Sequence, residues 1–118
     1  MMLMIVDDNA EVRRLIRRIC RGVADSFCEC SDGNEALNTY CTQQPDWVVM
    51  DIRMEVMDGL TATRQILAAY PAAQIVITTR FDDAEMREAA RQAGAYAFVP
   101  KDDLLALRRT IIESRPAC

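Results

Sequence analysis

Four apolar runs in this chain are each followed by a polar residue of a kind used in phosphoryl chemistry. The runs and the polar residues that end them are Leu3–Val6 with Asp7 and Asp8, Trp47–Met50 with Asp51, Gln74–Ile77 with Thr79, and Tyr96–Val99 with Lys101. A carboxylate can receive a phosphoryl group, whereas a hydroxyl and an ammonium can bind its oxygens. If the runs are parallel strands, these groups meet at one edge of a sheet.

The apolar runs are continuous rather than alternating, which is typical of strands that are covered on both faces. Segments with helical periodicity separate them, and a parallel pair of strands needs such a crossover. A further strand is expected at Ser26–Ser31. Helices are expected between Asn9 and Gly22, from Asp32 to Thr42, from Leu60 to Tyr70, from Asp82 to Ala93, and from Asp102 to about Arg115–Pro116. The pattern predicts an α/β domain, a doubly wound parallel sheet with five strands and five helices.

The expected helices carry apolar stripes and capping signals. Asp32 with Glu35 and Asp82 with Glu85 are spaced as capping boxes. The stripe of the first helix comprises Val12, Leu15, Ile16, Ile19 and Cys20, and that of the last comprises Leu104, Leu105, Leu107, Ile111 and Ile112. The opposite face of the first helix is rich in arginine, which either docks a helical bundle or is simply solvated.

Composition restricts the class of protein. With 118 residues the chain is expected to be a single domain, residues 1–118, and its net charge of -4 gives no reason to expect direct nucleic-acid binding. The apolar runs are too short to span a membrane, so a cytoplasmic location is expected. Five cysteines without a Cys-x-x-Cys pair, and the absence of histidine, argue against a disulfide framework, a zinc site and histidine-based catalysis.

The three aspartates require a cation if they converge. Two like charges about 4 Å apart repel by roughly 1 to 4 kcal/mol at the dielectric constants of water and a protein surface. Oxygen-only ligands favour a hard ion, and Mg²⁺ takes one or two carboxylates together with waters and a phosphate oxygen. We therefore expect Asp7, Asp8 and Asp51 to surround Mg²⁺, with Mn²⁺ as the alternative.

The order and spacing of these residues resemble the receiver domain of two-component response regulators. Thr79 and Lys101 follow Asp51 by 28 and 50 residues. The matching stretches are Ile5-Val6-Asp7-Asp8-Asn9, Asp51-Ile52-Arg53-Met54 with Met57-Asp58-Gly59-Leu60, Thr79-Arg80-Phe81-Asp82-Asp83, and Gly94-Ala95-Tyr96-Ala97-Phe98-Val99-Pro100-Lys101. The resemblance covers essentially the whole chain and implies a flavodoxin-like three-layer sandwich with strand order 2-1-3-4-5.

The resemblance also implies a role for each matching residue. Asp51 would be the phosphoacceptor, and Lys101 and Thr79 would bind the phosphoryl oxygens. The metal ligands would be Asp8, Asp51 and the backbone carbonyl of Arg53, with Asp7 bound through water. Thr79 would move inward on phosphorylation and the ring of Phe98 would rotate from exposed to buried, which would change the output face formed by the last two helices and their strand.

The implied partners are a sensor histidine kinase or a histidine phosphotransfer protein, and an output partner or C-terminal effector domain. A homodimer formed on phosphorylation remains open. The domain would assist its own phosphorylation and dephosphorylation without being a dedicated enzyme. A hydrolase that uses Asp51 as its nucleophile is disfavoured, because position 53 holds an arginine and not an acid or base that could turn over an intermediate.

Three departures from the family pattern leave an alternative open. The loop after Asp51 reads Met54-Glu55-Val56-Met57 without its usual proline and glycine, and Glu55 would alter metal affinity. Arg80 follows the switch threonine and could act as a gate, contact the phosphate or be solvated. Asp102 replaces a frequent proline after Lys101, so the intervening peptide is expected to be trans or strained. These departures suit a receiver-like interaction module that is not phosphorylated.

Overall fold

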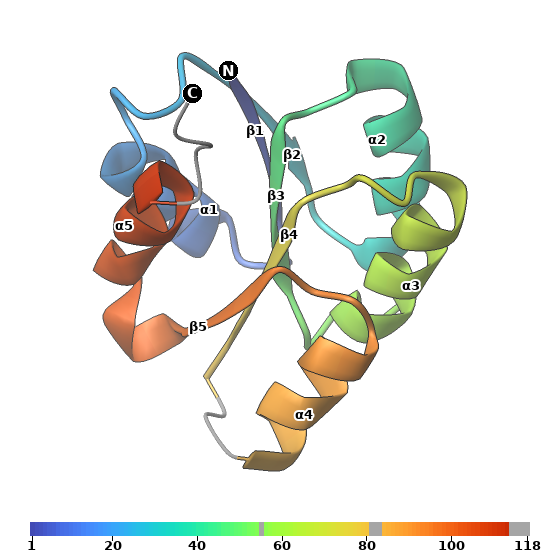
Figure 1. Cartoon of the computed structure of the whole chain (residues 1–118). Helices are drawn as coiled ribbons and strands as arrows, with labels where there is room; N and C mark the ends of the chain where they lie inside the picture. The colour runs from blue at the N-terminus through green and yellow to red at the C-terminus, as the bar shows by residue number, and fades with distance from the viewer. Residues whose placement is uncertain (55, 81–83, 114–118) are drawn as a thin grey trace.

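The computed structural model describes residues 1–54, 56–80 and 84–113, and its centre is a five-stranded parallel sheet in the order β2-β1-β3-β4-β5 (Figure 1). The strands are β1 Met2–Val6, β2 Ser26–Cys30, β3 Trp47–Asp51, β4 Ile75–Thr79 and β5 Ala97–Pro100. The helices are α1 Ala10–Ile19, α2 Ala36–Gln43, α3 Gly59–Ala69, α4 Ala84–Gln92 and α5 Leu105–Glu113, with short 3₁₀ helices η1 Gly33–Glu35 and η2 Lys101–Asp103. The predicted doubly wound sheet and strand order are confirmed.

Helices cover both faces of the sheet. In Figure 1, α1 and α5 lie on one side, and α2, α3 and α4 lie on the other. Successive side chains of a strand point to opposite faces, so Leu3 and Ile5 of β1 pack in the core beneath α1 and α5, whereas Met4 and Val6 pack in the core beneath the other three helices. Burial on both faces explains why the strands read as continuous apolar runs.

The strand register places the expected functional residues side by side. Val6 of β1 pairs with Met50 of β3, so Asp7 and Asp51, which come next in the two segments, lie side by side. On the other side, Asp51 pairs with Thr78 of β4. The carboxyl ends of all strands of a parallel sheet face the same way, and the crevice at such an edge is the usual place for a ligand.

The predicted capping box at Asp32 is only half formed. Asp32 does accept a hydrogen bond from the backbone N–H of Asn34, at 3.2 Å. Glu35, however, lies within 3.4 Å of the hydroxyl of Ser31 instead of the Asp32 N–H, and the first turn is the 3₁₀ helix η1 rather than α-helix. The other expected box, at Asp82, lies outside the described residues.

The first helix ends earlier than expected. It ends at Ile19, and Gly22 lies in the following turn with φ of 89°. Its carbonyl end is capped from α5, because Arg108 Nη1 donates to the backbone oxygens of Ile19 at 3.2 Å and Arg21 at 2.8 Å. This contact gives α1 a C-terminal partner that its own sequence does not supply.

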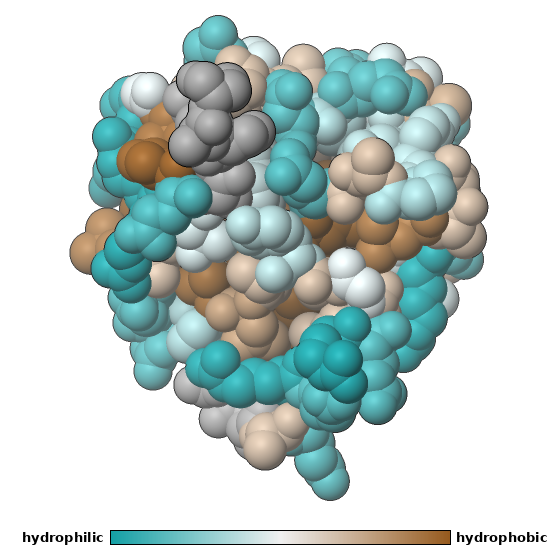
Figure 2. Space-filling view, in the orientation of Figure 1, coloured by the Kyte–Doolittle hydropathy of each residue, from teal (hydrophilic) through white to brown (hydrophobic). Residues whose placement is uncertain are grey.

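Three residues of the predicted apolar stripes lie at the surface. Leu15 of α1 is 41% exposed, and Leu105 and Ile112 of α5 are 72% and 47% exposed. The rest of both stripes is buried or half-buried. Each helix therefore packs against the sheet over a narrower strip than the sequence pattern predicts. Figure 2 shows hydrophobic and hydrophilic residues interspersed over the visible face. Among the described residues, no helix has the length and apolar character that a membrane span requires.

Candidate functional site

Three aspartates converge where β1 and β3 end. One carboxylate oxygen from each of Asp7, Asp8 and Asp51 lies within 4.8 Å of the others. Asp7 is 1% exposed and Asp51 is 3% exposed, whereas Asp8 is open to solvent. The cluster therefore has a buried base formed by two strand-end residues and one exposed member at the entrance.

Lys101 brings a positive charge to the base of this cluster. It directly follows β5, and its Nζ lies 2.9 Å from Asp7 Oδ2 and 3.2 Å from Asp51 Oδ1. One ammonium thus bridges the two buried carboxylates, and the three-acid cluster keeps an excess of negative charge.

The described residues contain no cis peptide, so the peptide between Lys101 and Asp102 is trans.

The electrostatics of Asp51 reflect that excess. Burial and the negative charge of Asp7 raise the pKa of Asp51 from 3.8 to about 6, although Lys101 opposes the shift. Asp7 Oδ2 lies close to the Lys101 ammonium but has no aligned hydrogen-bond donor among the described residues. A buried carboxylate oxygen that can still bind a further cation or donor, and that lies beside two further carboxylates, suits a hard cation with oxygen ligands.

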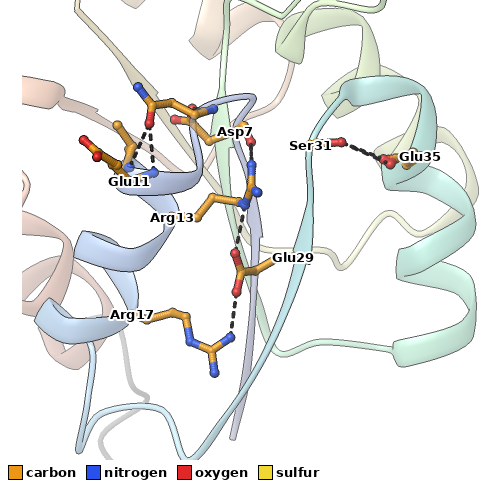
Figure 3. Close-up of polar contacts among 9 residues, drawn as sticks. Asp7, Glu11, Arg13, Arg17, Glu29, Ser31 and Glu35 are labelled. Atoms are coloured by element: carbon orange, nitrogen blue, oxygen red, sulfur yellow. Dashed lines mark hydrogen bonds and ion pairs between the residues drawn. The ribbon is translucent and has the colours of Figure 1, made fainter.

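Asp7 is held in place by its backbone and its side chain (Figure 3). The N–H of Asn9 donates to Asp7 Oδ1 at 2.9 Å, and the guanidinium of Arg13 donates to the Asp7 carbonyl. Glu29 of β2 orients Arg13 by accepting from its Nε at 2.8 Å, and it also accepts from Arg17 at 2.6 Å. Partly exposed ion pairs of this kind contribute less than about 1 kcal/mol each, so their main effect here is to orient side chains.

The acidic cluster opens into a cavity of about 710 Å³. Its lining residues are Asp8, Asn9, Ala10, Asp51, Arg53, Thr79, Arg80 and Lys101. Thr79 is buried and faces this cavity, whereas neighbouring Thr78 does not line it, as the alternation of a strand requires. Arg53 and Arg80 are exposed at its mouth. The cavity thus combines carboxylates, a hydroxyl and several cationic groups.

Phe98, the expected switch residue, is half-buried in β5 and does not line the cavity. Its ring packs with the core on the α4 side of the sheet, and the guanidinium carbon of Arg87 lies 4.8 Å from the ring centroid. This distance is within the range of a cation–π contact. The contact with Arg87 was not among the sequence predictions.

Two further residues support the site through contacts that the sequence did not predict. Asp32, from the loop after β2, accepts hydrogen bonds from the backbone of Val56 and Met57. Gly59, the first residue of α3, leaves no room for a side chain, because a Cβ there would lie 1.9 Å from the carbonyl oxygen of Asp51. The sequence carries no signal for either contact. Glu55 lies outside the described residues.

Comparison with known proteins agrees with this geometry. The family model of the response regulator receiver domain matches residues 3–111. The chain is 36% identical over 97 residues to the DNA-binding transcriptional regulator NtrC of Klebsiella pneumoniae, covering 82% of this chain and 21% of that protein. It is 39% identical over 102 residues to protein-glutamate methylesterase/protein-glutamine glutaminase 3 of Hahella chejuensis, covering 84% of this chain and 29% of that protein.

Solved structures show the same fold. A two-component response regulator of the LuxR family from Aurantimonas sp. SI85-9A1 is 33% identical, with a TM-score of 0.87 over 95% of this chain and 82% of that chain. The chemotaxis protein CheY4 of Vibrio cholerae is 21% identical, with a TM-score of 0.86 over 95% of this chain and 96% of that one. This chain spans less than a third of the two curated relatives above but nearly all of the CheY4 structure. The chain belongs to the response regulator receiver domain family of two-component systems.

Proposed function

We propose that this chain, residues 1–118, is a single phosphoacceptor domain that takes a phosphoryl group on Asp51 from a sensor histidine kinase or a histidine phosphotransfer protein. The observation that carries the proposal is the convergence of Asp7, Asp8 and Asp51 with Lys101 in a cluster that opens into one cavity. An acceptor carboxylate needs neighbours that counter the charge of the incoming group, and this cluster supplies an ammonium and a cation site.

In the proposed transfer, an ionised oxygen of Asp51 attacks the phosphorus of the donor phosphohistidine. The new oxygen–phosphorus bond forms as the phosphorus–nitrogen bond breaks, and the donor imidazole keeps the electron pair of the broken bond. Lys101, already 3.2 Å from Asp51, would then bind a phosphoryl oxygen. The product is an acyl phosphate on Asp51.

The oxygen ligands around Asp51 fit a divalent cation. Asp8, Asp51 and the Arg53 carbonyl would hold Mg²⁺ or Mn²⁺, and Asp7 would hold it through water. When bound, the ion would neutralise negative charge on the transferring group. The unsatisfied capacity of Asp7 Oδ2 and the mutual approach of the three carboxylates within 4.8 Å support this assignment.

Phosphorylation would be transmitted through Thr79 and Phe98. The hydroxyl of Thr79 would donate to a phosphoryl oxygen, and the space it vacates would let the Phe98 ring turn inward. That rotation would separate the ring from Arg87, which now lies 4.8 Å from it on α4. An output partner that binds the α4–β5–α5 face would then distinguish the two states.

The output of the domain would come from another part of the same protein or from a partner. The chain spans 21% and 29% of the first two curated relatives, so an attached effector domain or a separate partner would supply the output. The domain would act in the cytoplasm without binding DNA itself, and a phosphorylated homodimer would be one output state. It would assist only its own phosphorylation and dephosphorylation.

A decisive test is intact mass spectrometry after incubation with a small acyl phosphate or phosphoramidate donor. We expect one phosphoryl adduct with Mg²⁺, little or none with a chelator, and a modified peptide that contains Asp51 after trapping with borohydride. Absence of the adduct would favour the second candidate, a receiver-like interaction module that is not phosphorylated. The exposed Arg80 at the cavity mouth is the observation that favours this second candidate.

Arg80 also gives a prediction about rate. Its long side chain lies at the entrance of the cavity that holds Asp51, where it would hinder small donors and hydrolytic water. We therefore expect Arg80→Ala to become phosphorylated several-fold faster and to lose the phosphoryl group faster. Time courses of adduct gain and loss by mass spectrometry would measure both rates. Arg64→Ala, an exposed arginine of α3 that does not line the cavity, is the control. Two unchanged rates in Arg80→Ala would refute the gate.

A further inference from the structure

The loop between β3 and α3 is tied to a different part of the chain by the side chain of Asp32. Asp32 Oδ2 accepts from the N–H of Val56 at 3.0 Å, and Oδ1 accepts from the N–H of Met57 at 3.0 Å. Oδ1 also accepts from the N–H of Asn34 at 3.2 Å. One carboxylate therefore caps η1 and binds two consecutive amides of a loop more than twenty residues later in the sequence.

The backbones on the two sides of this contact are closely packed. A Cβ on Gly33, the first residue of η1, would lie only 2.5 Å from the Met57 carbonyl oxygen and 3.2 Å from Ala62 Cβ. At the base of the loop, the N–H of Gly59 donates to the Ile52 carbonyl at 2.8 Å. Asp32 and the packing at Gly33 thus fix the outer part of a loop that the Gly59 bond closes at its base.

The composition of the loop gives this external contact its importance. Residues 54–57 contain neither proline nor glycine, so the loop has no fixed backbone angle of its own. The same loop contains Arg53, which lines the cavity beside Asp51. We propose that Asp32 is a positioning residue that, by binding the Val56 and Met57 amides, holds the Arg53 carbonyl where it can bind the divalent cation. This inference rests on the proposed function, because it concerns the same metal site.

The charge of Asp32 agrees with this role. Partial burial disfavours its ionised form, but the backbone N–H groups of Val56, Asn34, Met57 and Gly33 outweigh burial and lower the pKa of Asp32. The side chain is therefore an anion at neutral pH, when it is the strongest acceptor for amide donors.

The test combines amide hydrogen exchange in the metal-free protein with titration of Mg²⁺ by calorimetry. In Asp32→Ala we expect the Val56 and Met57 amides to exchange roughly tenfold faster, because their acceptor is gone. We expect the dissociation constant for Mg²⁺ to rise roughly tenfold, the lower end of the effect of removing a group that orients a metal ligand. Neither measurement depends on phosphorylation.

Two further variants separate positioning from charge and from general stability. Asp32→Asn removes the charge but keeps one acceptor oxygen, so its exchange rates and Mg²⁺ affinity should lie between those of wild type and Asp32→Ala. Asp46→Ala removes another aspartate that accepts a backbone N–H from a distant segment, that of Met2 at 2.7 Å. Asp46 directly precedes β3, at the amino ends of the strands and thus at the far side of the sheet from the acidic cluster. This control should therefore leave Mg²⁺ affinity unchanged.

The outcomes are distinct. Faster exchange at Val56 and Met57 with weaker Mg²⁺ binding in Asp32→Ala, but not in Asp46→Ala, would support the proposal. Unchanged exchange would overturn the contact, and unchanged Mg²⁺ affinity would reduce Asp32 to a structural cap. An equal loss of Mg²⁺ affinity in Asp32→Asn and Asp32→Ala would assign the effect to the charge of Asp32 and overturn positioning by hydrogen bonds. A wild-type protein that forms no adduct on Asp51 would contradict only the proposed function.

Discussion

Asp51→Asn is expected to be more stable than the wild-type protein by about 1 to 3 kcal/mol in metal-free buffer at pH 7. Asp51 is buried beside Asp7, and this environment raises its pKa from 3.8 to about 6. A tenfold change in a protonation equilibrium corresponds to about 1.4 kcal/mol, so holding this carboxylate ionised costs the native state up to about 3 kcal/mol. Asparagine removes the charge at nearly the same volume, and Lys101 keeps its ion pair with Asp7.

The sign of the pH dependence provides the sharper measurement. Between about pH 4 and pH 6 the native wild-type protein keeps a proton on Asp51 that the unfolded chain has lost, so its free energy of unfolding falls as the pH rises through this window. The advantage of Asp51→Asn should therefore be small near pH 4 and complete above pH 6. Urea denaturation at a series of pH values would show this.

Mg²⁺ supplies an independent readout of the same charge. Since a ligand that binds only the native state stabilises it, added Mg²⁺ should stabilise the wild-type protein and narrow its difference from Asp51→Asn. Asp46→Asn, at an exposed position on the opposite edge of the sheet, is the control and should show neither effect. A wild-type protein as stable as Asp51→Asn at pH 7 would contradict the prediction, as would an advantage that persists unchanged at pH 4.

The part of the site carried by strand ends could be predicted from the sequence. Continuous apolar runs locate buried parallel strands, and parallel strands share the edge at which they end. This argument placed Asp7, Asp51 and Lys101 together, and the structure brings them within ion-pair distance. It works because strand position and chain direction are properties of local sequence, and the sheet converts them into proximity.

The supports of the site could not be predicted in the same way. The hydrogen bond that the Val56 N–H donates to Asp32, like the one that Arg108 donates to the carbonyl of Ile19 at the end of α1, joins segments far apart in sequence and depends on how two elements pack. The apolar stripe of a helix likewise predicts which side of the helix faces the sheet, but it does not predict how wide the contact with the sheet is. Leu15 and Leu105 therefore lie at the surface although they belong to apolar stripes.

Gly59→Ala is expected to destabilise the protein by about 3 kcal/mol or more. Helix propensity alone predicts the opposite, because alanine is about 1 kcal/mol more favourable than glycine inside a helix. At this position, however, a Cβ would lie 1.9 Å from the Asp51 carbonyl oxygen, 2.8 Å from its carbon and 2.9 Å from Met50 Cγ. Backbone atoms of a central strand cannot move aside cheaply, so α3 must shift away from β3.

The same shift would reach the site, because the atoms that collide belong to the phosphoacceptor residue. We therefore expect Gly59→Ala to lower both the urea midpoint and the extent of Asp51 phosphorylation at a temperature where the variant is still folded. Gly22→Ala is the matched control, since a Cβ there would meet no atom closer than Arg108 Nη2 at 3.9 Å. Its φ of 89° should cost only about 1 to 2 kcal/mol, without effect on phosphorylation. A Gly59→Ala protein as stable as Gly22→Ala would show that α3 does not pack against Asp51 as described.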